Sequence, residues 1–370
     1  MRQKSVLRVS SDLYPETIGG IGIHVDRLAT DLTKRGWKNI VLTVQLNREA
    51  KTEVRNGYKI IRVPCRMQLS GNKITPLILR KLLELKSEIS IIHAHSHLFF
   101  STNVAALFRR IYSLPLVVTC HGVWSQTVPM NFQQLYMRSI GVLTLNSADG
   151  VICYTDEEKQ VLKKLGVKEN KIVVIPNGVD TCFFTPNSKL NSNGKLLWVG
   201  RFVRGKRPDI PIKAMINIQK EIPGASLRMV GSGPLKSYCC NLVNKYRLSR
   251  SIQFLSHVSD EQLLRLYRES SVVLLSSEQE GVPRTILEAL SCSIPVVVSD
   301  LPQIRPIVRN CGFYYRVGDL SEMVEKTLKL LLTPRLRFEF GRIGRRKVCE
   351  NYSWNRFVDR TLKLYESLIS

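Results

Sequence analysis

Two glutamates flank the predicted start of a helix within Ser276–Leu290. An apolar run at Val272–Leu275 predicts a strand, and Pro283 is a favourable residue to open the amphipathic helix that follows. The unpaired N–H groups of a helix N-terminus attract a phosphate. Glu280 precedes the first turn and Glu288 lies roughly 8 Å further along the helix. A sugar on one side of that phosphate and a ribose on the other would each meet one carboxylate, although such glutamates can also simply face solvent.

Two cations follow another predicted strand, Leu196–Val199, on a loop that contains glycine. Arg201 can bind two phosphate oxygens at once, and Lys206 supplies a point charge, so the pair suits a diphosphate. We expect the neighbouring Arg204 and Arg207 to be solvated.

Histidines mark the ends of two predicted strands in the first half of the chain. His121 follows Leu116–Cys120, where a neutral imidazole can hydrogen-bond a sugar hydroxyl or a developing charge, or serve a purely structural role. His93, His95 and His97 alternate and would share one face of a strand, which is a pattern that a metal can use. No Asp, Glu or Cys has a matching spacing, so we predict a structural role for the triplet and no metal site.

The composition limits the class of protein. A chain of 370 residues predicts two domains, and no stretch approaches the length of a membrane-spanning helix. The first residues break their apolar run with charges and do not resemble a signal peptide. Nine cysteines without CxxC spacing favour a reducing compartment, so we expect a cytoplasmic location. The formal charge of +25 attracts anions, but it is spread evenly over the two halves of the chain.

Strand and helix patterns alternate through both halves of the chain. A strand at Val6–Ser10, a loop with Gly19, Gly20 and Gly22, and a helix ending at Gly36 predict a Rossmann-like first unit. A turn at 176–180 and a polar linker at 185–194 separate it from a second set of elements. This alternation predicts two parallel sheets covered by helices, with ligands bound at the carboxyl ends of the strands. The further strands expected in the first half are Ile40–Val44, Tyr58–Val63, Ile89–His93, Leu116–Cys120, Gly150–Tyr154 and Ile172–Ile175.

Several of these segments together resemble the retaining glycosyltransferases of the GT-B type, notably family 4. The segments that carry the resemblance are GGIG at 19–22, TCHG at 119–122, PNGVD at 176–180, VGRFVRGK at 199–206, the two glutamates Glu280 and Glu288 with seven residues between them, and the Ser-Trp pair at 353–354. They occur in the expected order over nearly the whole chain, which makes the set far more specific than any one member.

The resemblance implies a fold, a reaction and a set of site residues. The fold would be two Rossmann-like α/β domains with a cleft between them, an acceptor domain at 1–177, a donor domain at 178–352, and a C-terminal helix at 353–370 that crosses back to the first domain. The reaction would be metal-independent, retaining, hexosyltransferase-like transfer from a nucleoside-diphosphate sugar to a carbohydrate or lipid-linked acceptor, without a cofactor. The implied catalytic residues are His121, Arg201, Lys206 and Glu280, and the implied donor-binding residues are Gly20, Gly22, Gly231, Val258, Gly281, Val282, Arg284, Thr285 and Glu288.

The sequence departs from the family pattern at two places. His257 stands where the family usually has glycine beside the nucleotide base, and Val282-Pro283 replaces the commoner Phe-Gly. Proline has no N–H, so Arg284 and Thr285 would have to contribute more to phosphate binding.

Two other functions and one partner are also open. A GT-B sugar-nucleotide epimerase would share the donor site, and a basic nucleic-acid-binding protein would explain the charge, although no aromatic–basic repeat supports it and we expect no nucleic acid partner. Basic and apolar residues are interleaved at Cys65–Leu85 and again at Arg109–Tyr112. Such segments predict peripheral contact with an anionic membrane surface, on the inner face of the cell membrane, or else a helix packed on the sheet.

Overall fold

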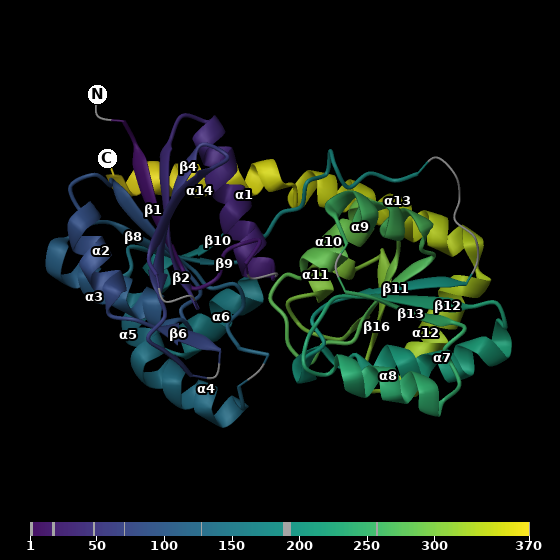
Figure 1. Ribbon diagram of the computed structural model, residues 1–370. Helices are drawn as coiled ribbons and strands as arrows, with labels where there is room; N and C mark the ends of the chain where they lie inside the picture. The colour runs from purple at the N-terminus through teal and green to yellow at the C-terminus, as the bar shows by residue number, and fades with distance from the viewer. Residues whose placement is uncertain are drawn as a thin grey trace. The chain divides into compact units, whose positions relative to one another are not determined.

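The computed structural model describes residues 3–16, 19–46, 49–69, 71–126, 128–187, 194–256 and 258–369. The chain forms two compact units, Met1–Pro176 together with Phe357–Ser370, and Asn177–Arg356. Each unit has its own largely parallel sheet with helices packed on it (Figure 1). This confirms the predicted α/β class with two Rossmann-like domains.

The first unit is built on an eight-stranded sheet in the order β10-β9-β8-β7-β1-β2-β4-β3, in which only β3 runs antiparallel to its neighbour. Its strands are β1 (Ser5–Ser10), β2 (Lys38–Gln45), β3 (Lys51–Arg55), β4 (Tyr58–Pro64), β7 (Ile91–His95), β8 (Leu116–Thr119), β9 (Gly150–Cys153) and β10 (Ile172–Val174), and a separate hairpin pairs β5 (Met67–Leu69) with β6 (Asn72–Ile74). The central strands are buried along their whole length, as expected for a parallel sheet covered on both faces.

Helices cover both faces of this sheet. They are α1 (Gly20–Lys34), α2 (Leu77–Leu85), α3 (Phe100–Tyr112), α4 (Met130–Tyr136), the π-helix η1 (Met137–Gly141), α5 (Val142–Ser147), α6 (Asp156–Lys164), the short 3-10 helix η2 (Glu169–Lys171) and the end of α14 (Trp354–Ile369). Successive residues of β7 show the two faces: Ile92 and Ala94 join an apolar core with α2 and α3, whereas His93 and His95 contact aromatic rings of α14 and α1.

The second unit has a six-stranded parallel sheet in the order β13-β12-β11-β14-β15-β16. Figure 1 shows α7, α8 and α12 on one face of it and α9, α10 and α13 on the other. The strands are β11 (Lys195–Val199), β12 (Ser226–Val230), β13 (Ile252–Leu255), β14 (Val272–Leu275), β15 (Val296–Ser299) and β16 (Gly312–Tyr315), and the helices are η3 (Arg204–Lys206, a 3-10 turn), α7 (Asp209–Glu221), α8 (Lys236–Lys245), α9 (Asp260–Glu269), α10 (Arg284–Ser291), α11 (Arg305–Val308), α12 (Leu320–Leu332) and α13 (Pro334–Asn351). β11 lies beside β14, which brings the loops that follow these two strands together.

One predicted strand needs a correction. β7 begins at Ile91 and ends at His95, two residues later than predicted. The basic and apolar stretch at Cys65–Leu85 is packed in part: Ile78 and Leu82 of α2 are fully buried and Lys73 is buried against Asp12, 3.1 Å away, whereas Met67 and Leu69 are exposed, so a membrane contact there stays a prediction. None of the helices within the described ranges is long and apolar enough to cross a membrane.

Candidate active site

The loop after β11 and the loop after β14 are joined by backbone and side-chain contacts. The Glu278 N–H donates to the carbonyl of Gly205 at 2.8 Å, and the Ser276 hydroxyl donates to the carbonyl of Lys206 at the same distance. The indole N–H of Trp198, at the end of β11, donates to Ser276 at 3.1 Å. Parallel strands that are neighbours in a sheet end at the same edge, so the two loops lie together there.

Lys206 and Glu280 form a close ion pair at this edge. The Nζ of Lys206 contacts Oε1 of Glu280, and the Ser277 hydroxyl donates to the same oxygen at 2.6 Å. Only 13% of the Lys206 side chain and 7% of the Glu280 side chain are exposed. The amide of Gln303 also donates to the backbone carbonyl of Glu280. A cation able to take a phosphate oxygen and a carboxylate able to face a developing positive charge therefore lie side by side.

Arg201 and its basic neighbours differ in their surroundings. Arg201 and Arg204 are exposed. The prediction that Arg207 is solvated was wrong: its guanidinium binds Asp209 at 3.0 and 3.2 Å and Glu278 at 3.2 Å. These carboxylates raise the pKa of Arg207 further above its usual range. Arg207 thus helps to hold the loop and is not available as a third phosphate ligand without losing those contacts.

Glu288 lies inside α10 with both carboxylate oxygens occupied. Its Oε1 accepts from Arg284 at 2.9 Å, and its Oε2 accepts from the hydroxyl of Tyr267 at 2.9 Å. The side chain is almost fully buried. A ribose hydroxyl could bind a second acceptor position of a carboxylate oxygen or replace Arg284, which is the more exposed of the two partners.

Thr285, in the first turn of α10, has a buried hydroxyl with no hydrogen-bond partner in the described part of the chain. Pro283 is the extended N-cap residue, and no side chain caps the helix. An unpartnered buried hydroxyl normally costs stability, so its retention is consistent with a ligand as its partner. Gly281 is partly exposed just before the helix, whereas Val282 is buried, with its carbonyl accepting from the Asn177 amide at 3.3 Å.

The remaining predicted donor residues divide into two kinds. Gly231 has a positive φ of 136°, and a Cβ there would lie 2.0 Å from the carbonyl oxygen of Gly200, so the fold itself requires glycine. Gly20 is the opposite case, since a Cβ would meet nothing within 4 Å and its backbone is helical. Gly22 is buried in the same turn of α1. Val258 is partly exposed, and the neighbouring His257 lies outside the described residues.

His121 belongs to the first unit, where both of its ring nitrogens are engaged. The Tyr154 hydroxyl lies 2.7 Å from Nδ1 of His121, and Nδ1 of His95 lies 3.0 Å from its Nε2. Burial, with a smaller contribution from His97, lowers the pKa of His121 to about 3, so the ring is neutral. A neutral ring with the Nε2 proton donates to His95 and accepts from Tyr154. A sugar hydroxyl would have to replace one of these partners.

The histidines cluster differently from the predicted triplet. His93 and His95 share a face of β7, but His97 lies beyond the strand, after Ser96 with its left-handed φ of 65°. Among the residues that the structure describes, the group within reach of one ion is instead His24, His95 and His121, whose ligand atoms all lie within 4.8 Å of one another. Three neutral imidazoles can in principle hold zinc. The sequence could not indicate this set, because it joins α1, β7 and the turn after β8.

Several residues of these sites were not singled out in the sequence. Ser277, Gln303 and Tyr267 fix the two glutamates, and Tyr154 fixes His121. The only local signal was position, since Tyr154 is the last residue of the predicted strand Gly150–Tyr154 and Ser277 lies two residues after the predicted strand Val272–Leu275.

The family models, relatives and solved structures that this chain resembles all point to glycosyltransferases. The model of Glycosyltransferase Family 4 matches residues 18–183, and that of Glycosyl transferases group 1 matches residues 184–347. The glycogen synthase of Mycobacterium tuberculosis is 23% identical over 97% of this chain and 94% of its own length. The phosphatidylinositol N-acetylglucosaminyltransferase GPI3 subunit of Saccharomyces cerevisiae is 22% identical over 96% of this chain and 81% of its own length. The crystal structure of Anabaena HepE in complex with UDP superposes with a TM-score of 0.80 over 99% of this chain and 100% of that one, at 17% identity.

The two family models adjoin at residues 183 and 184 and together span residues 18–347. The structural match extends over nearly the whole of both chains. The chain therefore belongs to the group 1 glycosyltransferases with the GT-B fold.

Proposed function

We propose that this glycosyltransferase moves a sugar from a nucleoside-diphosphate sugar to an acceptor hydroxyl with retention of the anomeric configuration. The observation that carries the proposal is the buried Lys206–Glu280 pair beside the uncapped N-terminus of α10. That edge of the sheet offers a cation and free backbone N–H groups for the leaving diphosphate and a carboxylate for the reacting sugar. The UDP bound to Anabaena HepE, a protein of the same fold, supports a nucleotide as the ligand.

The chain's own residues would stabilise the leaving group without a metal. Arg201 and Lys206 would bind the diphosphate oxygens, and the Thr285 hydroxyl would donate to one of them. Glu280 would then be released from Lys206 and left to stabilise positive charge at the anomeric carbon. His121, neutral over the working range of pH, would donate to or accept from a sugar hydroxyl after giving up one of its present partners.

We propose a cytoplasmic enzyme with a lipid-linked acceptor. Nine cysteines are all free, and five of them are buried, as suits a reducing compartment. The relatives named phosphatidylinositol N-acetylglucosaminyltransferase support a membrane lipid as the acceptor, whereas the relative named glycogen synthase supports a polysaccharide.

A panel of sugar nucleotides tests the donor. One of them should raise the unfolding temperature, since a ligand at 100 times its dissociation constant adds about 2.7 kcal/mol of stability. Incubation of that donor with candidate acceptors, followed by NMR of the product, should show a new glycosidic bond of unchanged anomeric configuration. An inverted linkage would contradict retention. Conversion of the donor to an epimer without an acceptor would make the chain an epimerase.

A further inference from the structure

An unusual apolar surface covers one helical layer of the first unit. We call the described outward face of α3, α4, η1 and α5 the α3–α5 surface. Seven of the seventeen large hydrophobic side chains that are exposed in the described residues lie within residues 107–143. The most exposed are Leu135 at 70% and Phe132 at 68%. The remaining five are Leu107, Ile111, Tyr112, Ile140 and Leu143.

These side chains lie on one continuous layer. α4, η1 and α5 follow one another without a break from Met130 to Ser147, and α5 packs on α3. The inner face of this run buries Gln133, Met137, Gly141, Thr144 and Leu145. The outer face should then be polar, but Arg138 is the only charged residue from 130 to 147. The fold gives no reason for an apolar outer face.

The same part of the chain contains no negative charge. Residues 89–148 hold no Asp or Glu, although the whole chain has thirty. Three arginines do occur there, Arg109, Arg110 and Arg138. A surface that combines apolar side chains with cations and excludes carboxylates is complementary to anionic lipid head groups.

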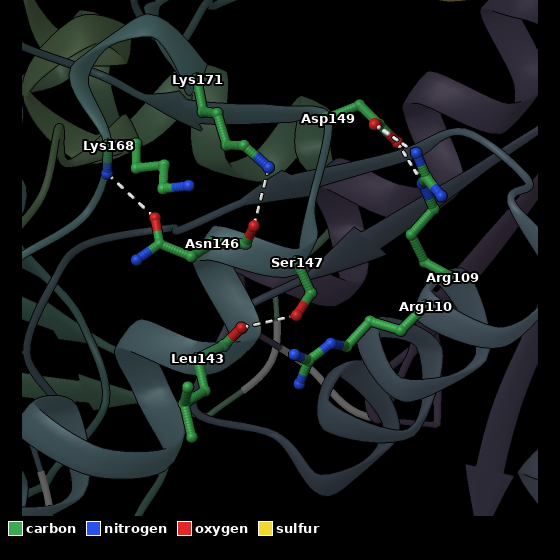
Figure 2. A pocket seen from close by; sticks show the side chains of 8 residues that line it. All are labelled: Arg109, Arg110, Leu143, Asn146, Ser147, Asp149, Lys168 and Lys171. Carbon is green, nitrogen blue, oxygen red and sulfur yellow. Dashed lines mark hydrogen bonds and ion pairs between the residues drawn. The ribbon is translucent and has the colours of Figure 1, made fainter.

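A basic pocket adjoins this surface, as Figure 2 shows. It has a volume of about 320 Å³ and is lined by four cations, Arg109, Arg110, Lys168 and Lys171, together with Leu143 of the apolar surface. Asp149 is its single acid, and it is held by both arms of the Arg109 guanidinium at 2.6 and 2.7 Å.

The four cations are not equally available. Lys171 donates to the carbonyls of Asn146 and Ala148 at 2.7 and 2.6 Å, which points it into the structure. Arg110 and Lys168 are exposed, and their side chains make no ion pair or hydrogen bond within the described residues. The pocket therefore has two cations free to bind a phosphate oxygen.

We propose that the α3–α5 surface docks on an anionic phospholipid membrane, with the apolar side chains in the interfacial layer and a lipid phosphate in the basic pocket. The proposal rests on the proposed function only in its link to a lipid-linked acceptor. The evidence for docking itself comes from the α3–α5 surface. The proposed contact differs from the contact predicted at Cys65–Leu85, which stays a prediction, and it retains the contact predicted at Arg109–Tyr112. Docking of this kind would hold the first unit at the surface where a lipid-linked acceptor is found.

Flotation with vesicles tests the proposal without any donor or acceptor, so its failure is distinct from failure of the transfer reaction. We expect the full chain to float with vesicles of phosphatidylcholine containing 30% phosphatidylglycerol in low salt. Binding to pure phosphatidylcholine vesicles should be at least tenfold weaker, and 0.5 M salt should weaken binding to the anionic vesicles because it screens the head-group charge.

Two pairs of substitutions separate the apolar and basic contributions. Phe132→Asp with Leu135→Asp should lower binding to anionic vesicles at least tenfold, and Arg110→Glu with Lys168→Glu should remove the preference for anionic lipid. The matched controls lie in the second unit: Leu332→Asp with Phe338→Asp, on side chains of similar exposure, and Arg342→Glu with Arg346→Glu, with the same change in net charge. Both control pairs should bind as the unchanged chain does. If the aspartate pair fails to fold, Phe132→Ser with Leu135→Ser takes its place.

Three outcomes would overturn the proposal. The first is equal binding to anionic and neutral vesicles, or none to either. The second is unchanged binding in both pairs of variants at the α3–α5 surface. The third, measured by light scattering, is a dimer of the unchanged chain that is lost in the Phe132 and Leu135 variants without any vesicle binding, which would assign the surface to a second copy of this chain.

Discussion

Lys206 forms an ion pair with Glu280, and the proposed reaction requires that the Glu280 carboxylate be released from this pair. Without a donor the two charges neutralise each other in a nearly buried position, which avoids leaving either one alone. A diphosphate would compete for the lysine and release Glu280 at the moment when the sugar arrives. The pair therefore links donor binding to the readiness of the carboxylate.

Replacement of Arg201 or Lys206 by alanine should lower transfer by about 10²–10³-fold, because each removes one donor to a developing anion. Steady-state rates with saturating acceptor measure the loss, and the unfolding temperature shows whether the fold survives. Arg204→Ala is the matched control, since it removes an exposed cation from the same loop. Full activity in either test variant would remove these cations from the mechanism.

Substitution of each of the two glutamates should change a different kinetic parameter. Glu288→Gln should mainly raise the KM for the donor, since contacts to the ribose are similar in the ground and transition states. Glu280→Gln should mainly lower kcat, since its contact strengthens as charge develops on the sugar. Glutamine keeps acceptors for Tyr267 and Ser277, so neither change should unfold the chain. Equal effects on KM alone would contradict this division, and Glu278→Gln is the control.

Thr285→Val separates a ligand role from a structural one. Valine has nearly the same shape, and the hydroxyl it removes has no partner within the described chain, so stability should be unchanged or higher. Donor affinity should fall about tenfold, the equivalent of one hydrogen bond of about 1.4 kcal/mol. Titration of the donor into both proteins measures this. Unchanged affinity would mean that the hydroxyl never meets the phosphate.

At the scale of elements, the carboxyl end of β7 and the turn after β8 create a buried cluster of neutral imidazoles. Burial lowers the pKa of His97 to about 4 and that of His121 to about 3, and it lowers the pKa of His93 and His95 well below the usual range. Below pH 6.5 the unfolded chain binds protons that the folded chain does not. Stability should therefore fall with falling pH, by about 1.4 kcal/mol per pH unit for each such histidine.

Glu158 on α6 acts in the opposite direction. Burial raises its pKa to about 7, so the folded chain holds this proton between about pH 7 and 4.5 while the unfolded chain does not. The effect of this one glutamate is opposite to that of several histidines. The free energy of unfolding, measured by denaturant titration, should therefore be clearly lower at pH 5 than at pH 7. The variant His97→Gln should show a smaller decrease in the free energy of unfolding. A free energy of unfolding that does not depend on pH would show that the histidines of the folded chain are already protonated or accessible to solvent.

The sequence predicted most of the parallel strands to within two residues, because each is an isolated buried apolar run. It did not indicate β15 or β16 or the β5–β6 hairpin. It also could not predict contacts that depend on strand order. Lys206 meets Glu280 across 74 residues only because β14 enters the sheet beside β11. The contact of Arg207 with Glu278 and the grouping of His24 with His95 and His121 have the same origin, since neither follows from local spacing. Asp209, the other partner of Arg207, lies only two residues away and could have been considered from the sequence.

At the scale of the whole molecule, we propose that transfer needs no bound metal, because Arg201 and Lys206 would neutralise the leaving diphosphate. We expect transfer to survive prolonged dialysis against EDTA at full rate. The group that could bind zinc is His24, His95 and His121, and His121 is also a proposed catalytic residue. Loss of activity that zinc alone restores would assign a metal to that cluster, and elemental analysis of the purified protein would show it directly.

The last helix has a consequence for how the protein is made. Phe357, Val358, Thr361 and Tyr365 of α14 are at most 1% exposed in the first unit, where the Tyr365 hydroxyl meets the ring of His93 and the buried guanidinium of Arg8. A ribosome has synthesised all of the second unit before it adds these residues. The core of the first unit therefore stays incomplete until the last residues of the chain have been made. A chain that stopped a dozen residues early would lack Thr361 and Tyr365, and the buried Arg8 and His93 would lose their contact with the Tyr365 hydroxyl.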